Sequence, residues 1–195
     1  MIERACAALN AGKPVVIPTD TVYGLAASPY RGEPAERLFE LKGRDRLQAI
    51  ALVAADVEMM FELVPELRGR CGRIVRALLP GPYTLIFPNP ARRYPWLTGS
   101  RPDTIGVRVP VLGGYGKQLL ARVGAVAATS ANLHGGLDPR TVSDIPQAIL
   151  NGVAEVVDDG PLPGTPSTVV DFTAADPVVI REGAGDVQRA LAVPA

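Results

Sequence analysis

The sequence predicts an α/β fold: a single domain over residues 1–195, with a twisted, open, mixed β-sheet and flanking helices. Short apolar runs alternate along the chain with segments whose apolar residues recur at helical spacing. The alternation is irregular and holds more strands than a strict βαβ series, which favours a mixed sheet. The 195 residues are 47% hydrophobic and 21% charged, which suffices for one sizeable core, and no shift in composition marks a second domain.

Helical spacing and capping residues predict the helices of the first half of the chain. Asp56 is a favourable N-cap, whereas Gly12 and Pro65 are helix stops. Apolar and β-branched runs predict the strands, and residues 26–31 are expected to form a loop. The predicted helices are residues 2–11, 34–42, 57–64 and 66–79, and the predicted strands are residues 15–17 and 50–53.

The second half is expected to be richer in strands. Pro80-Gly81-Pro82 ends the preceding helix, and the proline-rich and arginine-rich residues 88–103 are expected to form an irregular loop. Ser143 or Asp144 is expected to cap a helix that runs to Leu150. The predicted strands are residues 83–87, 105–109, 126–129, 153–157, 167–171 and 178–181, and the other predicted helices are residues 115–123 and 187–191.

Composition excludes several classes of protein. The formal net charge is zero, which argues against a strongly basic nucleic-acid binder but leaves room for a local basic face. The two cysteines, Cys6 and Cys71, lie far apart and are expected to be buried thiols in a reducing cytosol. His134 is the only histidine, so no metal site can use a histidine pair. No membrane span or signal peptide is visible, and we therefore expect a cytoplasmic protein.

The stretch VVIPTDTVYGL, residues 15–25, is the clearest candidate for a functional segment. A β-branched strand ends at Pro18 and is followed by Thr19, Asp20, Thr21 and Tyr23. A strand that ends in hydrogen-bonding side chains often delivers them to a pocket. Proline, aspartate and glycine are also ordinary turn residues, so this stretch alone leaves a pocket and a simple turn equally open.

Other strands end in the same way, in IGVRVP, AVAATSAN and PSTVVD. Their polar residues, together with Lys42-Gly43-Arg44, combine hydroxyls, an amide and cations, which suits a ligand that bears carboxylates or phosphates. Each motif has an ordinary structural explanation when taken alone. Arg108 could be a solvated strand residue, Ser130-Ala131-Asn132 a cap or turn, and Lys42-Gly43-Arg44 a helix C-terminus. No Walker or Rossmann glycine motif is present.

Seven motifs in order resemble those of one known family. They are PTDTVYGL, KGR, PGPYTLIF, IGVRVP, TSAN, STVVD and REG, and together they cover nearly the whole chain. The sequence is similar to the YrdC/Sua5 family of threonylcarbamoyl-AMP synthases, and its length resembles the short bacterial form. The resemblance implies a YrdC-like fold with a concave, positively charged cleft.

The resemblance also implies a reaction. L-Threonine and bicarbonate form an N-carboxylated threonine, which attacks the α-phosphate of ATP to give threonylcarbamoyl-AMP and pyrophosphate. A threonylcarbamoyl transferase machinery then modifies adenosine 37 of tRNA. Mg²⁺ is expected to accompany ATP, without a dedicated protein metal site.

Site residues carry over motif by motif. Thr21, Tyr23, Arg108 and Ser167 would hold threonine, and Lys42 and Arg44 would be catalytic by facing the carbamate and the phosphates. The nucleotide side would be lined by Arg44, Gln48, Thr104, Ser130, Asn132 and Arg181. The chain departs from the family pattern after KGR: Gln48 stands where asparagine is usual, Ala49 where proline is usual, and Val53 where a histidine often lies.

Two alternatives remain at this stage. The first is a non-catalytic YrdC-family paralogue that binds double-stranded RNA; the 17 arginines allow it, whereas the zero net charge weighs against it. The second is the related domain of hydrogenase maturation proteins, but this chain lacks the zinc-finger cysteine pairs and the length of those proteins.

Overall fold

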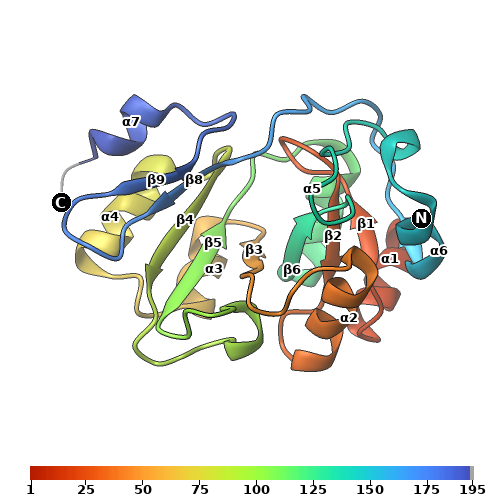
Figure 1. The fold of residues 1–195 in the computed structure, drawn as a ribbon, viewed down its shortest axis with the longest axis horizontal. Coiled ribbons are helices and arrows are strands. Elements are labelled where there is room, and N and C mark those ends of the chain that lie inside the picture. Colours follow the sequence, from red (N-terminus) through yellow and green to blue (C-terminus); the bar gives the residue numbers. More distant parts are fainter. Residues whose placement is uncertain (194–195) are drawn as a thin grey trace.

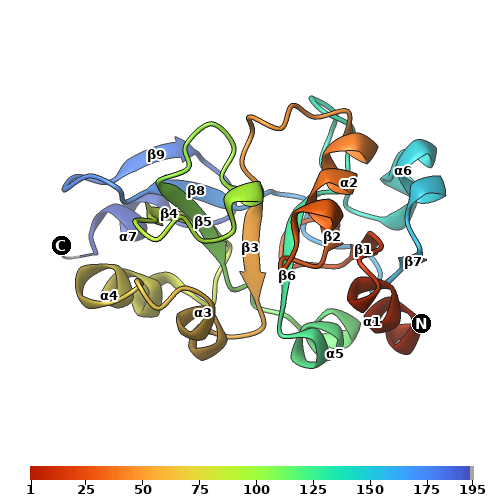
Figure 2. The same ribbon diagram turned by 90° about the horizontal axis from the view of Figure 1, so that it is seen from below.

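The strands of the described residues form one nine-stranded sheet, and its mixed character is as the sequence predicts. The structure is a computed structural model that describes residues 1–193, and its strand order is β7-β1-β2-β6-β3-β5-β4-β8-β9. Three neighbouring pairs are parallel (β1 with β7, β3 with β5, and β4 with β8), and the other five are antiparallel. The strongly twisted sheet runs the length of the molecule, with helices above and below it (Figures 1 and 2).

The elements follow the predicted order closely. The strands are β1 (Val15–Ile17), β2 (Gly24–Ala27), β3 (Ala51–Ala54), β4 (Tyr83–Pro88), β5 (Thr104–Arg108), β6 (Ala125–Ser130), β7 (Glu155–Val156), β8 (Thr168–Asp171) and β9 (Val178–Arg181). The α-helices are α1 (Ile2–Asn10), α2 (Gly32–Lys42), α3 (Val57–Leu63), α4 (Gly69–Leu78), α5 (Gly114–Val123), α6 (Gln147–Gly152) and α7 (Val187–Leu191). Two 3₁₀ turns are η1 (Pro95–Leu97) and η2 (Val142–Asp144).

The strands β1 and β2 are buried on both faces, and so are residues 125–128 of β6. Alternate residues of β1 belong to different hydrophobic clusters: Val16 packs into the larger one, and Val15 and Ile17 pack into the smaller one beside α1 and α5. Ala125 and Ala127 of β6 belong to the larger cluster, and Val126 and Ala128 belong to the smaller one. The side chains of β6 are small, so the two hydrophobic clusters can pack closely against its two faces.

One strand was missed by the sequence reading. Residues 26–31 were expected to be a loop, but Ala26 and Ala27 belong to β2, which pairs with β1 on one side and with β6 on the other. The segment GLAA has no β-branched or aromatic residue and hence no local strand signal. Pairing on both edges and complete burial, not propensity, make it a strand.

Three smaller expectations were also wrong. The helix expected from residue 66 begins at Gly69. The helix expected to run from Ser143 or Asp144 to Leu150 is divided at Pro146, and Thr141 caps the turn η2 that precedes the break. The two cysteines are free, as expected, but both are partly exposed instead of buried.

The cap of α3 confirms a local prediction. Asp56 has extended backbone geometry, and its side chain accepts a hydrogen bond of 2.7 Å from the backbone N–H of Met59. This bond satisfies one of the helix's unpaired N–H groups, so the cap should contribute directly to stability.

The substitution Asp56→Ala should lower the free energy of unfolding by about 1 kcal/mol, because it removes the capping acceptor. Equilibrium urea denaturation followed by circular dichroism measures the change. Asp56→Asn, which retains an oxygen acceptor, should lose much less. Equal stability of the alanine variant and the parent protein would contradict the assignment.

Candidate functional site

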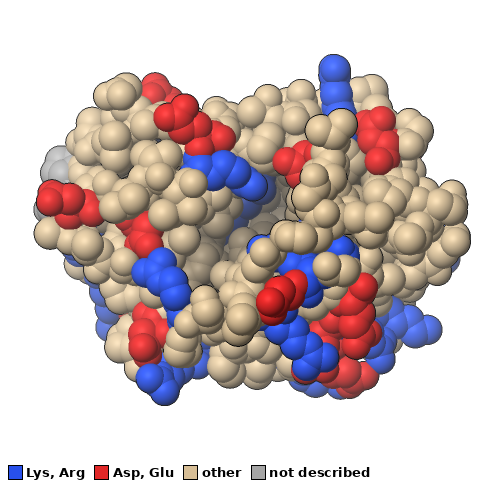
Figure 3. Space-filling view, viewed as in Figure 1, with Lys and Arg blue, Asp and Glu red and all other residues tan. Residues whose placement is uncertain are grey.

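A cleft of about 400 Å³ is lined by residues of seven of the strands, from β2 and β6 to β8 and β9. It lies within the range of small-molecule sites, and the space-filling view shows the surface hollowed at this place, with cationic side chains at its edge (Figure 3). Its described lining contains four arginines, eight hydroxyl residues and no acidic residue. These are Arg44, Arg101, Arg108 and Arg181, with Thr19, Thr84, Thr98, Ser100, Thr104, Thr129, Ser130 and Ser167.

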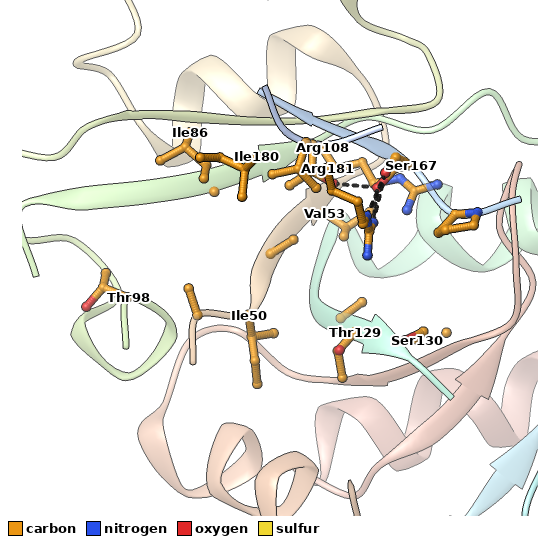
Figure 4. A pocket seen from close by; sticks show the side chains of 18 of the residues that line it. Ile50, Val53, Ile86, Thr98, Arg108, Thr129, Ser130, Ser167, Ile180 and Arg181 are labelled. Atoms are coloured by element: carbon orange, nitrogen blue, oxygen red, sulfur yellow. Dashed lines mark hydrogen bonds between the residues drawn. The ribbon is translucent and has the colours of Figure 1, made fainter. Parts of the chain in front are cut away.

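The alternation of β4 and β5 builds the floor of the cleft. Thr104, Gly106 and Arg108 of β5 face the cleft, whereas Ile105 and Val107 between them are buried in the core. Thr84 and Ile86 of β4 line the same floor. Ile86 and Ile180 lie together at one end of the pocket, and Arg108, Arg181 and Ser167 lie beyond them (Figure 4). The site therefore joins an apolar end to a cationic one.

Arg108 is a largely enclosed cation that lines the cleft. Its side chain is only 11% exposed. The alternative that Arg108 is an ordinary solvated residue of the strand is therefore excluded. Its Nη2 donates to the Asp20 carboxylate and to the Thr21 hydroxyl, the latter at 2.7 Å. The PTDT segment and β5 are thereby joined at the wall of the cleft.

Arg181 and Ser167 form a second pair. Arg181 Nη2 donates to the Ser167 carbonyl at 2.8 Å and to Ser167 Oγ at 3.2 Å, and Ser167 Oγ is 2.9 Å from Thr84 Oγ1. Burial lowers the pKa of Arg181, Asp138 raises it, and Arg108 lowers it further. The two arginines thus repel each other, and an anionic ligand between them would relieve that repulsion.

Arg44 reaches the cleft from the end of α2. Its helix ends in the left-handed residue Gly43, with φ of 60°, as the sequence indicated. Arg44 Nη1 donates to Thr129 Oγ1 and Nη2 donates to the Ala49 carbonyl, both at 2.9 Å. Burial lowers the pKa of Arg44, and the positive charge of Arg181 lowers it further. Neutral oxygens therefore hold this guanidinium in place without neutralising it.

Lys42 and Asn132 stand behind the wall of the cleft and are not among its lining residues. Lys42 is 4% exposed, and its Nζ donates to the carbonyls of Ser130 (2.6 Å) and Asn132 (2.8 Å) and to Asn132 Oδ1. Asn132 also accepts from Ser130 Oγ and donates to the Gly136 carbonyl. In this structure both side chains fix the turn that presents Ser130 and Thr129 to the cleft.

Tyr23 and Thr21 also lie behind the wall. Tyr23 is fully buried, and its hydroxyl lies 2.7 Å from the Gly160 carbonyl and accepts from the Asp159 N–H at 3.1 Å. Burial raises the pKa of Tyr23 to about 12, so its phenol stays protonated at neutral pH. Tyr23 therefore anchors the loop that joins β7 to β8.

The divergent stretch after KGR forms one side of the cleft. Leu47, Ala49, Ile50 and Val53 line it, but the Gln48 side chain does not. Residues 45–48 form a tight turn, in which Gln48 N–H donates to the Asp45 carbonyl at 3.0 Å. The residues that this stretch contributes to the cleft lining are therefore apolar.

The sequence reading missed Thr84, Thr98, Ser100 and Arg101. Thr84 could have been found from the period-two pattern of residues 83–87. Arg101 carried no local signal, because it lies in an irregular loop and is placed by Asp171 at 2.6 Å and Thr173 at 3.3 Å. Only tertiary contacts bring it to the cleft.

Two kinds of feature are absent from the described residues. The described residues contain no group of three or more histidine, cysteine, aspartate or glutamate residues placed to hold a metal ion. Within residues 1–193, no helix has the length and apolar character needed to cross a bilayer.

Comparison with known proteins supports the resemblance seen in the motifs. Residues 7–183 match the Sua5/YciO/YrdC family model, whose description is "Telomere recombination". A putative threonylcarbamoyl-AMP synthase of Mycobacterium tuberculosis is 32% identical over 189 residues, or 96% of this chain and 86% of that protein. A threonylcarbamoyl-AMP synthase of Methylococcus capsulatus is 39% identical over 145 residues, or 72% of this chain and 75% of that protein.

Solved structures show the same fold. Escherichia coli YciO aligns with a TM-score of 0.86 at 26% identity, covering 97% of this chain and 92% of that one. Pyrococcus abyssi Sua5, solved in complex with L-threonine, aligns with a TM-score of 0.83 at 31% identity, covering 93% of this chain. This chain spans about half of the Sua5 protein, 54% of its length. By fold, by matched residues and by these relatives, the chain belongs to the Sua5/YciO/YrdC family.

Proposed function

We propose that the protein is an L-threonylcarbamoyladenylate synthase, which makes threonylcarbamoyl-AMP and pyrophosphate from L-threonine, bicarbonate and ATP. The observation that carries the proposal is the convergence of Arg44, Arg108 and Arg181 on one cleft whose described lining has no carboxylate. The names of the relatives and the L-threonine bound to Pyrococcus abyssi Sua5 support the choice of substrates.

The reaction suits a cationic cleft of this kind. The threonine amine attacks the bicarbonate carbon and water leaves, which gives a carbamate. A carbamate oxygen then attacks the α-phosphorus of ATP, and pyrophosphate leaves. The carboxylate, the carbamate and the triphosphate are all anionic, so their mutual repulsion is the barrier that fixed guanidinium groups can lower. No protein nucleophile is needed.

The carboxylate of threonine is assigned to Arg108, with Ser167 beside it. Both line the cleft, and the Arg181 guanidinium donates to Ser167 Oγ. Thr21 and Tyr23 support this side from behind: Thr21 contacts Arg108, and Tyr23 holds the adjoining loop. Their contribution to threonine binding is thus indirect in this arrangement.

The nucleotide is assigned to the remaining part of the cleft. Arg44, Arg181 and Ser130 would face the phosphates, and the apolar end at Ile86 and Ile180 would receive the nucleoside. Thr104, which also lines the cleft, is assigned to the nucleotide as well. Asn132 and Lys42 position Ser130, and Gln48 shapes the turn at the rim. Mg²⁺ would enter with the triphosphate, whose charge it partly neutralises, because the described lining offers no carboxylate ligand.

The adenylate would pass to a threonylcarbamoyl transferase machinery that modifies adenosine 37 of tRNA. The names of the relatives favour this synthase activity over the alternative of a non-catalytic protein that binds double-stranded RNA. The four arginines that line the cleft also suit a small anionic ligand.

Purified protein should release pyrophosphate only when L-threonine, bicarbonate, ATP and Mg²⁺ are all present. Arg44→Met should slow this release by about 100-fold or more, because it removes a fixed positive charge from the transition state. A coupled pyrophosphate assay measures both rates.

Arg46→Met is the matched control for Arg44→Met. Arg46 lies two residues away, pairs with Glu36 on the surface with 63% of its side chain exposed, and does not line the cleft. Its replacement should leave the rate unchanged. The proposed function fails if the parent protein releases no pyrophosphate, and the role of Arg44 fails if both variants behave alike.

Lys42 should titrate far below its ordinary pKa. Burial and the charge of Arg44 lower its pKa from 10.5 to about 8, against the opposing effect of Asp138. The ammonium is therefore present at pH 7, with a hydrogen for each of its carbonyl acceptors. Above pH 8 the folded protein releases this proton while the unfolded chain retains it, so Lys42's contribution to the free energy of unfolding rises with pH from about 8 to 10.5.

NMR of protein labelled at the lysine Cε carbons measures the titration, and Lys42→Met identifies the resonance. We expect a midpoint near pH 8. A midpoint near pH 10.5 would contradict the expected lowering of the Lys42 pKa by burial.

A further inference from the structure

The Asp20 side chain lies behind the wall of the cleft, where it joins two separate segments. Its side chain is 9% exposed, and it is not among the residues that line the cleft. One carboxylate oxygen accepts from Arg108 Nη2, and the other accepts from the backbone N–H of Val111 at 3.0 Å. The carboxylate is therefore fixed at both oxygens by the end of β5 and the residues after it.

The contacts with Asp20 and Thr21 occupy both hydrogens of Arg108 Nη2. Each Nη nitrogen carries two hydrogens. The Nη2 hydrogens go to Asp20 and to Thr21 Oγ1, so both are occupied. The Arg108 Nε is buried without a partner among the described residues. Nη1 is the part of the guanidinium that remains for a ligand in the cleft.

The hydroxyl groups next to Arg108 are ordered in one direction. Thr21 Oγ1 accepts from Arg108, so its own hydrogen is free to go to Thr19 Oγ1, 3.0 Å away. Thr19 Oγ1 in turn donates to the Val22 carbonyl at 2.7 Å. The Thr21 hydroxyl has then given its only hydrogen to Thr19 and has none to donate to a substrate carboxylate. Asp20 and Thr21 therefore act on Arg108, and neither of them lines the cleft.

We propose that Asp20 is a positioning residue for substrate binding: together with Thr21 it holds the Arg108 guanidinium so that Nη1 faces the substrate carboxylate. The inference rests on the proposed function, because it takes L-threonine as the ligand of Arg108. It adds a residue that touches no substrate but sets how well the carboxylate is bound.

A purely structural tether is the competing explanation. In that case the Asp20–Arg108 pair would only join the loop after β1 to β5, and its loss would lower stability without a specific effect on threonine. Asp20→Asn separates the two explanations. It keeps the shape of the side chain, but the amide can accept only from Arg108 or from the Val111 N–H, and its NH₂ group then faces the other donor.

The experiment is a double-mutant cycle with four proteins: the parent, Asp20→Asn, Arg108→Met and the double variant. L-Threonine binding is measured by calorimetry, and the KM values for L-threonine and ATP come from pyrophosphate release. Asp20→Asn should weaken L-threonine binding by about 10-fold, the size expected when a residue that orients a ligand-binding group is lost. The KM for ATP should change less than about two-fold, since distant sites are independent.

The double variant carries the decisive comparison. If Asp20 acts through Arg108, adding Asp20→Asn to Arg108→Met should change L-threonine affinity less than about two-fold, because contacting residues are non-additive. Thermal unfolding gives a second readout. Arg108→Met leaves the Asp20 charge buried without its partner, so adding Asp20→Asn should raise the melting temperature above that of the single Arg108→Met variant.

The outcomes separate the two proposals. If the parent protein does not bind L-threonine, the proposed function fails, and the inference fails with it. If the parent binds L-threonine and Asp20→Asn binds it equally well or more tightly, the inference alone is overturned. Equal weakening of L-threonine and ATP would show a general structural role for Asp20 and would also overturn it.

Discussion

Like charges in a partly buried space are the constraint on which the rest of the site depends. Four guanidinium groups line one cleft, and the surrounding fold stabilises each without placing a carboxylate in the described lining. Arg108 and Arg101 have acidic partners behind the wall, in Asp20 and Asp171. Arg44 and Arg181 are held by neutral hydroxyl and carbonyl oxygens. The positive potential is therefore left in the cleft, where an anionic ligand can use it.

The sheet makes this arrangement possible by bringing distant segments to one place. The parallel pair β4–β8 sets Ser167, just before β8, beside Thr84, and the antiparallel partner β9 ends in Arg181. The pair β4–β5 brings Arg108 to the opposite side of the same floor. Period-two alternation then directs every second residue of β4 and β5 into the cleft and the others into the core.

The motif residues have two different tasks. Arg44, Arg108, Ser130, Ser167 and Arg181 line the cleft. Thr21, Tyr23, Lys42 and Asn132 lie behind it, and each fixes a group or a loop that does line it. Thus a motif can be rich in polar residues because a ligand site needs a fixed wall as well as direct contacts. The TSAN turn illustrates this: the polar groups of Lys42 and Asn132 hydrogen-bond within the turn, whereas Ser130 faces the cleft.

The sequence by itself determined the elements that have strong local signals. Apolar periodicity and turn chemistry placed most helices and strands, the Asp56 cap and the Gly43 stop, and the seven motifs indicated the family and most of the cleft. The strand β2 was decided only by tertiary structure, because Gly24–Ala27 has no intrinsic preference for strand and is held by partners on both edges. Tertiary structure also decided which side of the wall each polar residue occupies. Hydrogen bonds to residues 171 and 173 hold Arg101 at the cleft. Hydrogen bonds to residues 159 and 160 hold the Tyr23 hydroxyl behind the wall. Such pairings join residues about 70 to 140 positions apart, and no local pattern in the chain encodes them.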